Sequence, residues 1–474
     1  MASKRKQRED RFVEIDVDSI GFEGVSVGRL DGVVHFVKGA LPGERVRARV
    51  LRSKKSYVEA EAVEIYTQAP SRITPPCEHF GVCGGCKWQH LDYPEQIRWK
   101  RQHVADAFQR LAKIPVGEVT ETIAAPNPFA YRNKMEFSFG ASAWLTNEEI
   151  ASGEDFDTRF ALGLHVPGRF DKVRHVKHCF LQSDAPNALL AAVHALRQQN
   201  PVTAHHQRSH EGFLRHLLVR SSATTGSVMT ALITTTPSTD AEQQFVEDWM
   251  ALYHTLPPES TLIHAVNETK SPVAVGTIEQ LVGTGYLTEN SHGVEYQISP
   301  FSFFQTNTEQ LPQLVGTALE YASLTPDDTV WDLYCGTGTL ALPAAKVAKH
   351  VFGAELVESS ILDAKGNAER NGITNADFHV VDLHTAEAIT LLKAAPQPDV
   401  IMIDPPRAGM HPMLVQHVLE VGAPRVSYVS CNPSTLARDC ALLAEAYDVE
   451  VVTPVDMFPQ TYHVEAVARL RKRA

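Results

Sequence analysis

The sequence predicts an α/β protein built from three parts: a small β-barrel, a central α+β domain and a carboxy-terminal doubly wound domain. Short alternating runs fill residues 11–68, mixed strand-like and helical runs follow, and after residue 300 apolar strand-length runs alternate with helical segments. With 474 residues, 43% of them apolar, the chain is long enough for about three domains with buried cores.

The amino-terminal part shows the pattern of a small all-β barrel. Short alternating runs are separated by glycines, at residues 25–27, 33–37, 45–51 and 56–65. Period-two alternation places Arg45, Arg47 and Arg49 on one face and small apolar groups on the other. That face is either a surface that follows RNA phosphates or an ordinary solvated strand face, and the pattern leaves both open.

A proline-bearing linker at residues 69–76 leads to a cysteine cluster and then to one predicted amphipathic helix over 94–114. Its apolar stripe consists of Ile97, Val104, Ala107, Phe108 and Leu111. The central part contains strand-like runs at 134–139, 214–220 and 228–234 and a helix near 187–198, with a polar surface loop expected at 147–157.

The carboxy-terminal third predicts a parallel sheet covered on both faces. Its apolar runs lie at residues 329–334, 351–355, 378–381, 400–403 and 426–430, and helical segments separate them. Ligands of such sheets bind beyond the carboxyl ends of the strands.

Composition excludes several classes of protein. The net charge of −12 argues against a protein that coats nucleic acid, although residues 1–58 hold thirteen Lys and Arg against eight Asp and Glu. A basic module on an acidic chain suits site-selective contact with RNA. No apolar run approaches the roughly twenty residues of a membrane helix, and the polar start, residues 1–11, does not resemble a secretory signal. We expect a cytoplasmic protein.

The first strand of the last domain ends in a short glycine loop, residues 332–339 (DLYCGTGT). The second strand ends at Glu355, where a carboxylate can accept hydrogen bonds from ribose hydroxyls, and Asp382 after the third can reach an adenine edge. The fourth ends in residues 404–407 (DPPR). A loop shorter than the dinucleotide fingerprint, together with this acid and its prolines, favours S-adenosylmethionine over a dinucleotide.

The fifth strand delivers Cys431 into an Asn-Pro turn on the ligand side of the sheet, although a free cysteine is more often a small core residue. Glu465 stands within an otherwise apolar terminal run, so it is either a satisfied structural acid or a functional one.

Four segments carry a resemblance to a known family. Residues 430–439 (SCNPSTLARD), 303–305 (FFQ), 404–407 (DPPR) and 463–465 (HVE) resemble those of the uracil-5-methyltransferases of ribosomal and transfer RNA, and similarity runs through nearly the whole chain. The resemblance implies that Cys431 is the nucleophile and Glu465 the proton acceptor. It also implies an S-adenosylmethionine site lined by Gln305, Tyr334, Gly336, Glu355, Asp382 and Asp404, and leaves Cys335 and Cys440 as packing residues.

The chemistry requires those two residue types. Carbon 5 of uracil is a poor nucleophile, but a thiolate that adds to carbon 6 makes carbon 5 enolate-like. A base must then remove the carbon 5 proton so that the thiolate can leave. The target base must also leave its stack to reach them.

The cysteine cluster, Cys77, Cys83 and Cys86, with Cys179 about ninety residues later, suits tetrahedral zinc or an iron–sulfur cluster, and His175 and His178 keep zinc possible. The resemblance implies a structural 4Fe-4S cluster on these four thiols. It also makes the barrel a TRAM domain, an RNA-binding OB-like module, and places residues 131–134 (YRNK) near RNA phosphates.

We therefore expect a TRAM barrel over 11–68, a central domain with the cluster over 69–92 and 123–300, and a class I (Rossmann-like) methyltransferase domain over 93–122 and 301–474. The helix near 94–114 would pack on the last of these. The predicted product is 5-methyluridine in structured RNA.

The RNA and the reaction each leave rivals. We favour 23S ribosomal RNA because relatives specialised for transfer RNA often lack both barrel and cluster, with the transfer RNA T-loop as the second candidate. The rival functions are RNA cytosine-5 methylation and a non-catalytic RNA-binding or assembly factor. No membrane and no obligate protein partner are implied.

Overall fold

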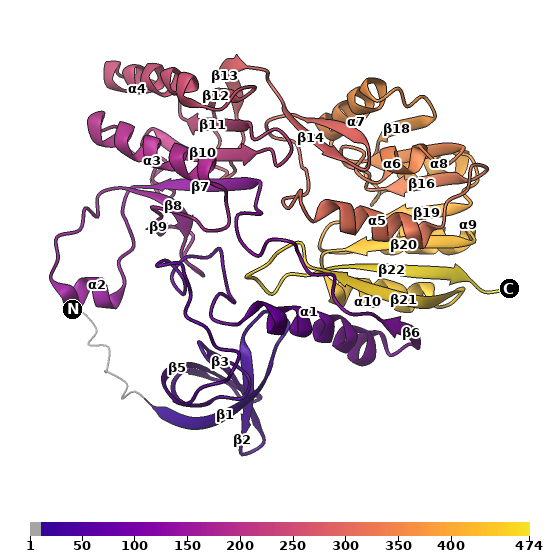
Figure 1. Cartoon of the computed structure of the whole chain (residues 1–474), viewed down its shortest axis with the longest axis horizontal. Helices are drawn as coiled ribbons and strands as arrows, with labels where there is room; N and C mark the ends of the chain where they lie inside the picture. The colour runs from indigo at the N-terminus through magenta and orange to yellow at the C-terminus, as the bar shows by residue number, and fades with distance from the viewer. Residues whose placement is uncertain (1–10) are drawn as a thin grey trace.

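The computed structural model describes residues 11–474. The polar start of the chain, residues 1–10, which contributes to the basic count above, lies outside the described residues. The described chain folds into three domains. In Figure 1 the barrel lies at the bottom, the central sheet at the upper left and the large carboxy-terminal sheet at the right. The predicted fold class is confirmed.

Five strands close the amino-terminal barrel in the order β1-β2-β3-β5-β4. Its interior is small and apolar, because alternate residues such as Val46 and Ala48 point inward and are fully buried. The strands are β1 Phe12–Ile20, β2 Ser26–Leu30, β3 Val33–Lys38, β4 Arg45–Ser53 and β5 Tyr57–Thr67.

The arginine face of β4 is paired with acids on the neighbouring strands. Arg45 contacts Glu14 at 3.2 Å, Arg47 contacts Glu64 at 3.7 Å and Arg49 contacts Glu61 at 2.9 Å. Cross-strand carboxylates partly cancel these positive charges, so the structure favours the solvated, salt-bridged face over a phosphate-binding wall.

A seven-stranded sheet in the order β13-β12-β11-β10-β7-β8-β9 forms the central domain, and α3 and α4 cover one face. Its strands are β7 Lys134–Gly140, β8 Ala161–His165, β9 Val173–His175, β10 Leu214–Ser221, β11 Val228–Thr234, β12 Thr261–Val266 and β13 Thr277–Gly283. Its helices are α2 Asn147–Ser152, α3 Asp184–Gln199 and α4 Asp240–Ala251, followed by a 3-10 turn at Leu252–Thr255.

The expected loop at 147–157 is partly wrong, since it begins with α2. Thr146 and Glu149 form a reciprocal capping box that holds this short helix although none of its residues is buried. After β13 a two-stranded hairpin, β14 Leu287–Ser291 and β15 Val294–Ile298, leads towards the last domain.

An eight-stranded sheet in the order β18-β17-β16-β19-β20-β22-β21-β6 forms the carboxy-terminal domain. The first five strands of that order are parallel, and β22 joins them antiparallel. The strands are β6 Val116–Val119, β16 Thr329–Leu333, β17 His350–Glu355, β18 Ala376–Val380, β19 Val400–Ile403, β20 Arg425–Ser430, β21 Tyr447–Val455 and β22 Glu465–Lys472.

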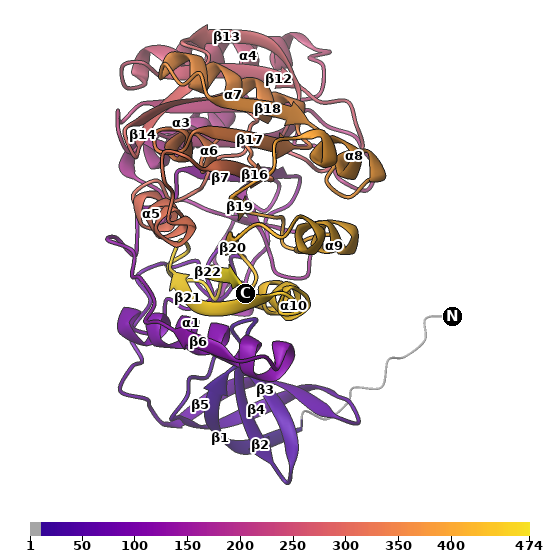
Figure 2. The ribbon, with the colours of Figure 1, turned by 90° about the vertical axis from the view of Figure 1, so that its right-hand side faces the viewer.

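Helices cover both faces of this sheet, as predicted for a doubly wound domain (Figure 2). On one face lie α5 Leu311–Ala322, α6 Ala341–Ala345 and α7 Glu358–Arg370. On the other lie α1 Tyr93–Ala107, α8 Ala386–Ala394, α9 Pro412–Val421 and α10 Pro433–Leu443.

The predicted helix over 94–114 ends earlier than expected. The α-helix stops at Ala107 and a π-turn, Phe108–Ala112, follows. This turn rotates Leu111 to the surface, where it is 59% exposed, while Val104, Ala107 and Phe108 pack into the core of the carboxy-terminal domain as predicted. The chain then enters β6, which joins the edge of that core's sheet.

Candidate active site

The sheet register brings Cys431 and Glu465 together. Ser430, at the end of β20, pairs with Ala466 in the antiparallel strand β22. One step further along each strand places Cys431 beside Glu465, although they are thirty-four positions apart in sequence. Glu465 is only 4% exposed and Cys431 is half-buried.

Electrostatics at this pair favour protonated groups. Burial raises the pKa of the Cys431 thiol to about 12, with further contributions from Glu465 and Asp404, while Arg407 opposes the shift. Burial and the nearby Asp404 likewise hold the pKa of Glu465 well above its ordinary value, and Arg407 again opposes this. The Arg407 guanidinium is therefore the group that favours the thiolate form of Cys431 and the carboxylate form of Glu465.

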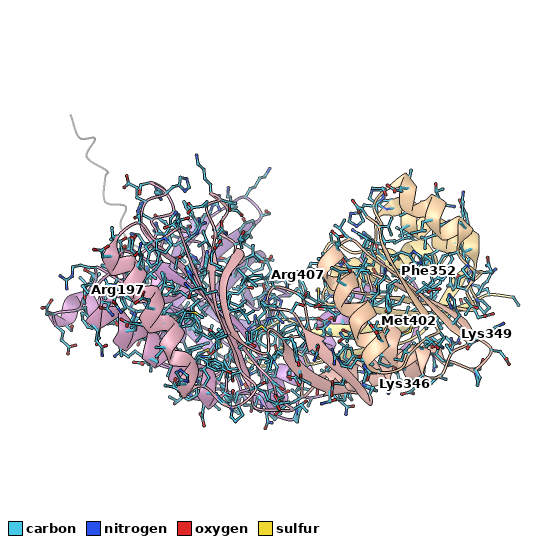
Figure 3. The ribbon with its side chains drawn as sticks, turned by 90° about the horizontal axis from the view of Figure 1, so that it is seen from above. Arg197, Lys346, Lys349, Phe352, Met402 and Arg407 are labelled. Carbon is cyan, nitrogen blue, oxygen red and sulfur yellow. The ribbon has the colours of Figure 1, made fainter. Side chains whose placement is uncertain are left out.

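Arg407 lies on the side of the carboxy-terminal sheet that faces the central domain, and Lys349 lies at the opposite end (Figure 3). Its guanidinium contacts His463 Nδ1 at 2.5 Å. Its backbone carbonyl accepts hydrogen bonds from Asn432 Nδ2 at 3.1 Å and Thr435 Oγ1 at 3.3 Å. The turn after Cys431 thus holds the 404–407 loop in place.

Asp439, which is fully buried in α10, supports the same loop. Its carboxylate accepts hydrogen bonds from the Met410 N–H at 2.8 Å and the Tyr428 hydroxyl at 2.6 Å. Gly409 has φ +77°, and an added Cβ there would approach the Asp439 carboxylate to 2.5 Å. Only glycine therefore fits this turn without displacing the carboxylate.

A buried ion pair anchors the turn that leads into Glu465. Lys100 of α1 and Asp456 are both fully buried and lie 2.5 Å apart. Asp456 also accepts hydrogen bonds from the Tyr93 hydroxyl at 3.0 Å and the Phe458 N–H at 3.0 Å. This pair could not be predicted from the sequence, because its members are separated by more than three hundred residues and isolated charges are usually solvated.

The predicted cofactor residues gather at the carboxyl ends of β16, β17 and β19. The Gly336 N–H donates to Glu355 Oε2 at 3.3 Å, and the Val357 N–H donates to Oε1 at 2.9 Å. Asp404 follows β19, and its N–H donates to the Leu333 carbonyl at 3.2 Å. This is the strand edge at which ligands of such sheets bind.

The glycine loop carries an unusual backbone at its first residue. Tyr334 adopts φ +68°, a left-handed conformation that costs a non-glycine residue about 1 kcal/mol or more. Gly336 and Gly338 are also left-handed, at φ +53° and +85°. This backbone ties the loop to the end of β17, because the N–H groups of Tyr334 and Cys335 both donate to the Ala354 carbonyl, at 2.9 and 3.1 Å.

Gln305 reaches the same edge from the connection before α5. Its Nε2 lies 3.5 Å from Asp404 Oδ2, and its backbone carbonyl accepts a hydrogen bond from Asn133 Nδ2 at 2.9 Å. Asp382 lies after β18, where one carboxylate oxygen accepts a hydrogen bond from the His384 N–H at 2.9 Å.

Asp332 is an acid at this edge to which the sequence assigned no role. It is fully buried, and both of its carboxylate oxygens find no side-chain partner within residues 11–474. Burial, with the nearby Asp404, raises its pKa to about 8. Sequence reasoning could have identified it as a candidate site residue, because it is an acid within a predicted apolar strand.

The segment 131–134 is largely structural. Tyr131 is buried and its hydroxyl donates to the Pro459 carbonyl at 3.0 Å, while Asn133 also contacts Thr308 Oγ1 at 2.5 Å. These two side chains therefore connect the central sheet to the carboxy-terminal domain. The expectation that the segment lies near RNA phosphates stays a prediction.

The four cluster cysteines line one apolar cavity between the 77–89 loop and the edge of the central sheet. It is lined by Cys77, Cys83, Cys86 and Cys179 with apolar partners that include Leu164 and Phe180. His178 also lines it, whereas the His175 ring lies tilted against that of His194, with centroids 4.2 Å apart. All four cysteines are free thiols.

Close backbone contacts and hydrogen bonds hold the 77–89 loop and Cys179 against the central sheet. An added Cβ at Gly84 would approach the His165 carbonyl oxygen to 2.8 Å, so the glycine lets the loop wrap closely against the end of β8. Asn187 fixes the other side, because its amide accepts from the Cys179 N–H at 2.9 Å and donates to the Cys179 carbonyl at 3.1 Å.

Within residues 11–474, no group of three or more His, Cys, Asp or Glu side chains is arranged to hold a metal ion. Cys335 and Cys440, predicted as packing residues, are both buried in the carboxy-terminal core. None of the helices within residues 11–474 is both long and apolar enough to cross a membrane.

Two family models match the chain. Residues 277–473 match tRNA (Uracil-5-)-methyltransferase, and residues 6–63 match the TRAM domain. The second match covers the described β-barrel up to part of β5.

Relatives match along almost the whole chain. A protein of Bacteroides thetaiotaomicron described as an RNA methyltransferase is 39% identical over 453 residues, which cover 95% of this chain and 99% of the relative. Another from Chlorobaculum tepidum is 39% identical over 444 residues, covering 92% and 91%.

One solved structure matches equally far. The Pyrococcus abyssi tRNA (uracil-54, C5)-methyltransferase, in complex with S-adenosyl-L-homocysteine, superposes with a TM-score of 0.74 at 26% identity. The match covers 97% of this chain and 100% of that one.

Proposed function

The chain belongs to the RNA (uracil-5-)-methyltransferase family, and we propose that it methylates carbon 5 of one uridine through a covalent bond between Cys431 and carbon 6. It is an S-adenosylmethionine-dependent RNA methyltransferase with a TRAM domain. The observation that carries the proposal is the β20–β22 register, which sets a thiol beside a buried carboxyl group at the ligand edge of the sheet.

Cys431 begins the reaction as a thiol, because burial raises its pKa to about 12. In the proposed step its proton passes to water, and its sulfur adds to carbon 6 of the extruded uracil. Arg407 favours this step, since its positive charge lowers the pKa of the thiol and can balance the developing charge on the base.

Bound S-adenosylmethionine would supply an electrophilic methyl group to carbon 5. Glu465 then takes the proton from carbon 5 and the bond between sulfur and carbon 6 breaks, which releases 5-methyluridine and the thiolate. A carboxyl group with a raised pKa is a stronger base when ionised than an exposed one, which suits removal of a carbon-bound proton.

The cofactor would lie across the edge formed by Gln305, Tyr334, Gly336, Glu355, Asp382 and Asp404. Glu355 is suited to ribose hydroxyls, because its oxygens already accept N–H donors and so point out of the strand end. Asp382 is suited to adenine, and Asp404 with Gln305 to the polar end nearest Cys431.

The four thiols Cys77, Cys83, Cys86 and Cys179 would hold a 4Fe-4S cluster, with zinc as the alternative. Support comes from their shared apolar cavity and the glycine wrap around it. The role would be structural, since the loop joins the central sheet to the turn at Gln460 through the Lys87 and Trp88 N–H groups, at 2.9 and 3.0 Å.

The substrate would be structured RNA in the cytoplasm, with 23S ribosomal RNA first and transfer RNA second. The solved relative weakens the preference for ribosomal RNA, because an enzyme named for uracil 54 of transfer RNA aligns over 97% of this chain, a span that must include much of the barrel. A barrel alone therefore does not separate the two substrates.

The test is a mass-spectrometric map of 5-methyluridine in ribosomal and transfer RNA from cells with the gene intact, deleted, and restored as Cys431→Ala. We expect one site to be lost on deletion and not regained with the variant. Loss in 23S ribosomal RNA supports the first substrate and loss in transfer RNA the second. Survival of every site, in cells without a second enzyme for it, would overturn the uridine proposal.

A further inference from the structure

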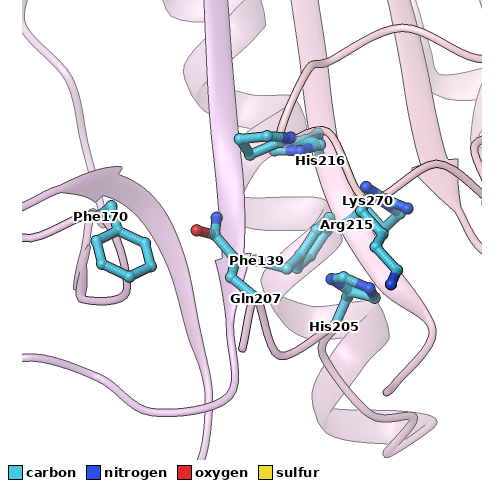
Figure 4. Close-up of a pocket in the computed structure, with 8 residues that line it drawn as sticks. Phe139, Phe170, His205, Gln207, Arg215, His216 and Lys270 are labelled. Atoms are coloured by element: carbon cyan, nitrogen blue, oxygen red, sulfur yellow. The ribbon is translucent and has the colours of Figure 1, made fainter. Parts of the chain in front are cut away.

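A second cavity lies in the central domain, away from the residues proposed for catalysis. It has a volume of about 200 Å³ and is lined by side chains that include Phe170, His205, Gln207, Arg215, His216 and Lys270. In Figure 4 the histidine, arginine and lysine side chains gather on one side and the Phe170 ring stands on the other. The cavity lies at the end of β7 and the start of β10.

The strand pattern relates this cavity to the catalytic domain. Alternation along β10 puts His216 and Arg220 on the same face of the sheet. Arg220 donates to the carbonyl of Ser302, three residues before Gln305. Four residues of strand span roughly 13 Å, so His216 stands about that far along the sheet from this contact.

The cavity carries positive charge. Arg215 is 4% exposed, and its guanidinium donates to the carbonyls of Asn267 at 2.6 Å, Thr269 at 2.7 Å and Ser271 at 2.9 Å. The carbonyls orient this group, Glu268 of the same loop offsets part of its charge, and its Nε–H finds no partner within residues 11–474. Lys270, exposed on the same loop, adds a second cation.

The other polar groups are neutral and can both donate and accept. Burial lowers the pKa of His205 and of His216 to about 4, so each ring carries one N–H and one acceptor nitrogen at neutral pH, and His216 Nδ1 already contacts Ser138 Oγ at 3.4 Å. The Gln207 amide has the same dual character. These groups match the donor and acceptor edge of a nucleobase better than a bare phosphate.

An exposed aromatic ring completes the set. Phe170 is 62% exposed at the tip of the β8–β9 connection, and the guanidinium of Arg208, which pairs with Asp171 at 2.8 Å, lies 5.3 Å from its centroid. Exposed aromatic side chains beside cations are the usual platform for unpaired bases in single-stranded RNA.

We propose that this cavity binds one unpaired nucleotide of the substrate RNA, distinct from the uridine that is methylated. Phe170 stacks on its base, Gln207 and the two histidines contact the base edge, and Lys270 faces its phosphate. The site gives the enzyme a second point of recognition on the central sheet. The inference rests on RNA as the substrate and not on the proposed covalent chemistry.

Steady-state methylation by the full-length enzyme tests this, with total RNA from gene-deleted cells as the probe. Phe170→Ala and Lys270→Ala alter exposed side chains, so the fold should be kept. Each should raise the KM for RNA by about tenfold, the size of one lost stacking or phosphate contact. Turnover at saturating RNA and the KM for S-adenosylmethionine should not change.

Matched controls are Ile150→Ala, an exposed apolar residue of the same domain, and Lys349→Ala on the far side of the molecule. Both should behave as the wild type. If Phe170→Ala and Lys270→Ala also leave the KM for RNA within twofold of the wild type, the inference is overturned.

Lysine footprinting gives a readout that does not need turnover. Bound total RNA should protect Lys270 from acetylation and leave Lys349 reactive. Equal acetylation of Lys270 with and without RNA contradicts the inference. A wild-type enzyme that binds RNA and protects Lys270 but forms no 5-methyluridine would instead refute the proposed reaction, so the two failures are distinguishable.

Discussion

Cys431 and the thiols of the cysteine loop are all half-buried, but their surroundings differ. Cys431 stands at the end of a regular strand, with the Arg407 guanidinium near enough to lower the pKa of its thiol. Cys83 and Cys86 stand in a loop, where burial raises their pKa values to about 11 and about 12 and Cys179 raises both further. Each site has a basic side chain that lowers a thiol pKa, Arg407 for Cys431 and Lys87 for Cys83, but only the loop places several thiols where each raises the pKa of the others.

The comparison shows that different interactions position Cys431 and the cysteine loop. The catalytic edge is positioned by sheet register, the buried Asp439 and the Lys100–Asp456 pair, all of which belong to the folded chain. The cysteine loop contains no strand or helix between residues 77 and 92 and depends on a few hydrogen bonds. Changes at the first should remove chemistry, and changes at the second should remove stability.

The largest expected effect is on turnover, for Cys431→Ala. Loss of the nucleophile should lower the methylation rate by at least about 10⁴-fold, while the melting temperature stays close to that of the wild type. Radiolabel transfer to RNA measures the rate. Cys440→Ala, in the same domain but in the core, is the matched control and should keep turnover while losing some stability.

A change in the cysteine loop should lower stability, in contrast with the loss of turnover expected for Cys431→Ala. The enzyme purified without oxygen should hold about four iron and four sulfide per chain, and Cys83→Ala should lose them and lower the melting temperature by several degrees. Binding of S-adenosylhomocysteine should persist. Zinc at about one per chain would replace the iron–sulfur proposal with the zinc alternative.

Asp332→Asn tests whether a buried acid at the proposed cofactor edge lowers the free energy of unfolding. Asp332 has a raised pKa of about 8, so the folded state keeps a proton that the unfolded chain loses above about pH 4. Its contribution to stability is therefore lost as the pH rises from about 4 to about 8. Asp332→Asn should gain stability relative to the wild type over that window, on the order of 1 kcal/mol or more at pH 8.

Urea unfolding at pH 5, 7 and 9 measures this difference. A constant gap between the two proteins across these values would mean that Asp332 is ionised in the folded state throughout.

The smallest effect is expected on the barrel. Arg47→Ala removes a cation that is already paired with Glu64, so RNA affinity in filter binding should fall by no more than about twofold. A tenfold loss would show that this face meets phosphates after all.

Much of this could be read from the sequence because it depends on local patterns. Period-two runs predicted the barrel, apolar runs between helices predicted the parallel sheet, and the spacing of the strand ends predicted where Glu355 and Asp404 would lie. The site roles of Cys431 and Glu465 rested on a family resemblance, which the matches support at the level of the reaction.

The rest depends on contacts between distant segments. The π-turn after Ala107, the pairing of the barrel arginines and the Lys100–Asp456 anchor are decided by packing partners far away in sequence. The base-binding cavity is similar, since Phe170, His205 and Lys270 come from three separate connections of the central sheet. Residues that come together from separate connections in this way show no periodic pattern in the sequence.

The central claim is that Cys431 bonds to the uracil and Glu465 removes the carbon 5 proton. Intact-mass measurement of Glu465→Gln after incubation with RNA, S-adenosylmethionine and a nuclease tests it most directly. The account predicts a species heavier by the mass of a methylated nucleotide fragment, absent from Cys431→Ala/Glu465→Gln, because the adduct forms but cannot release. A Glu465→Gln enzyme that turns over at the wild-type rate, with no such species, would contradict it.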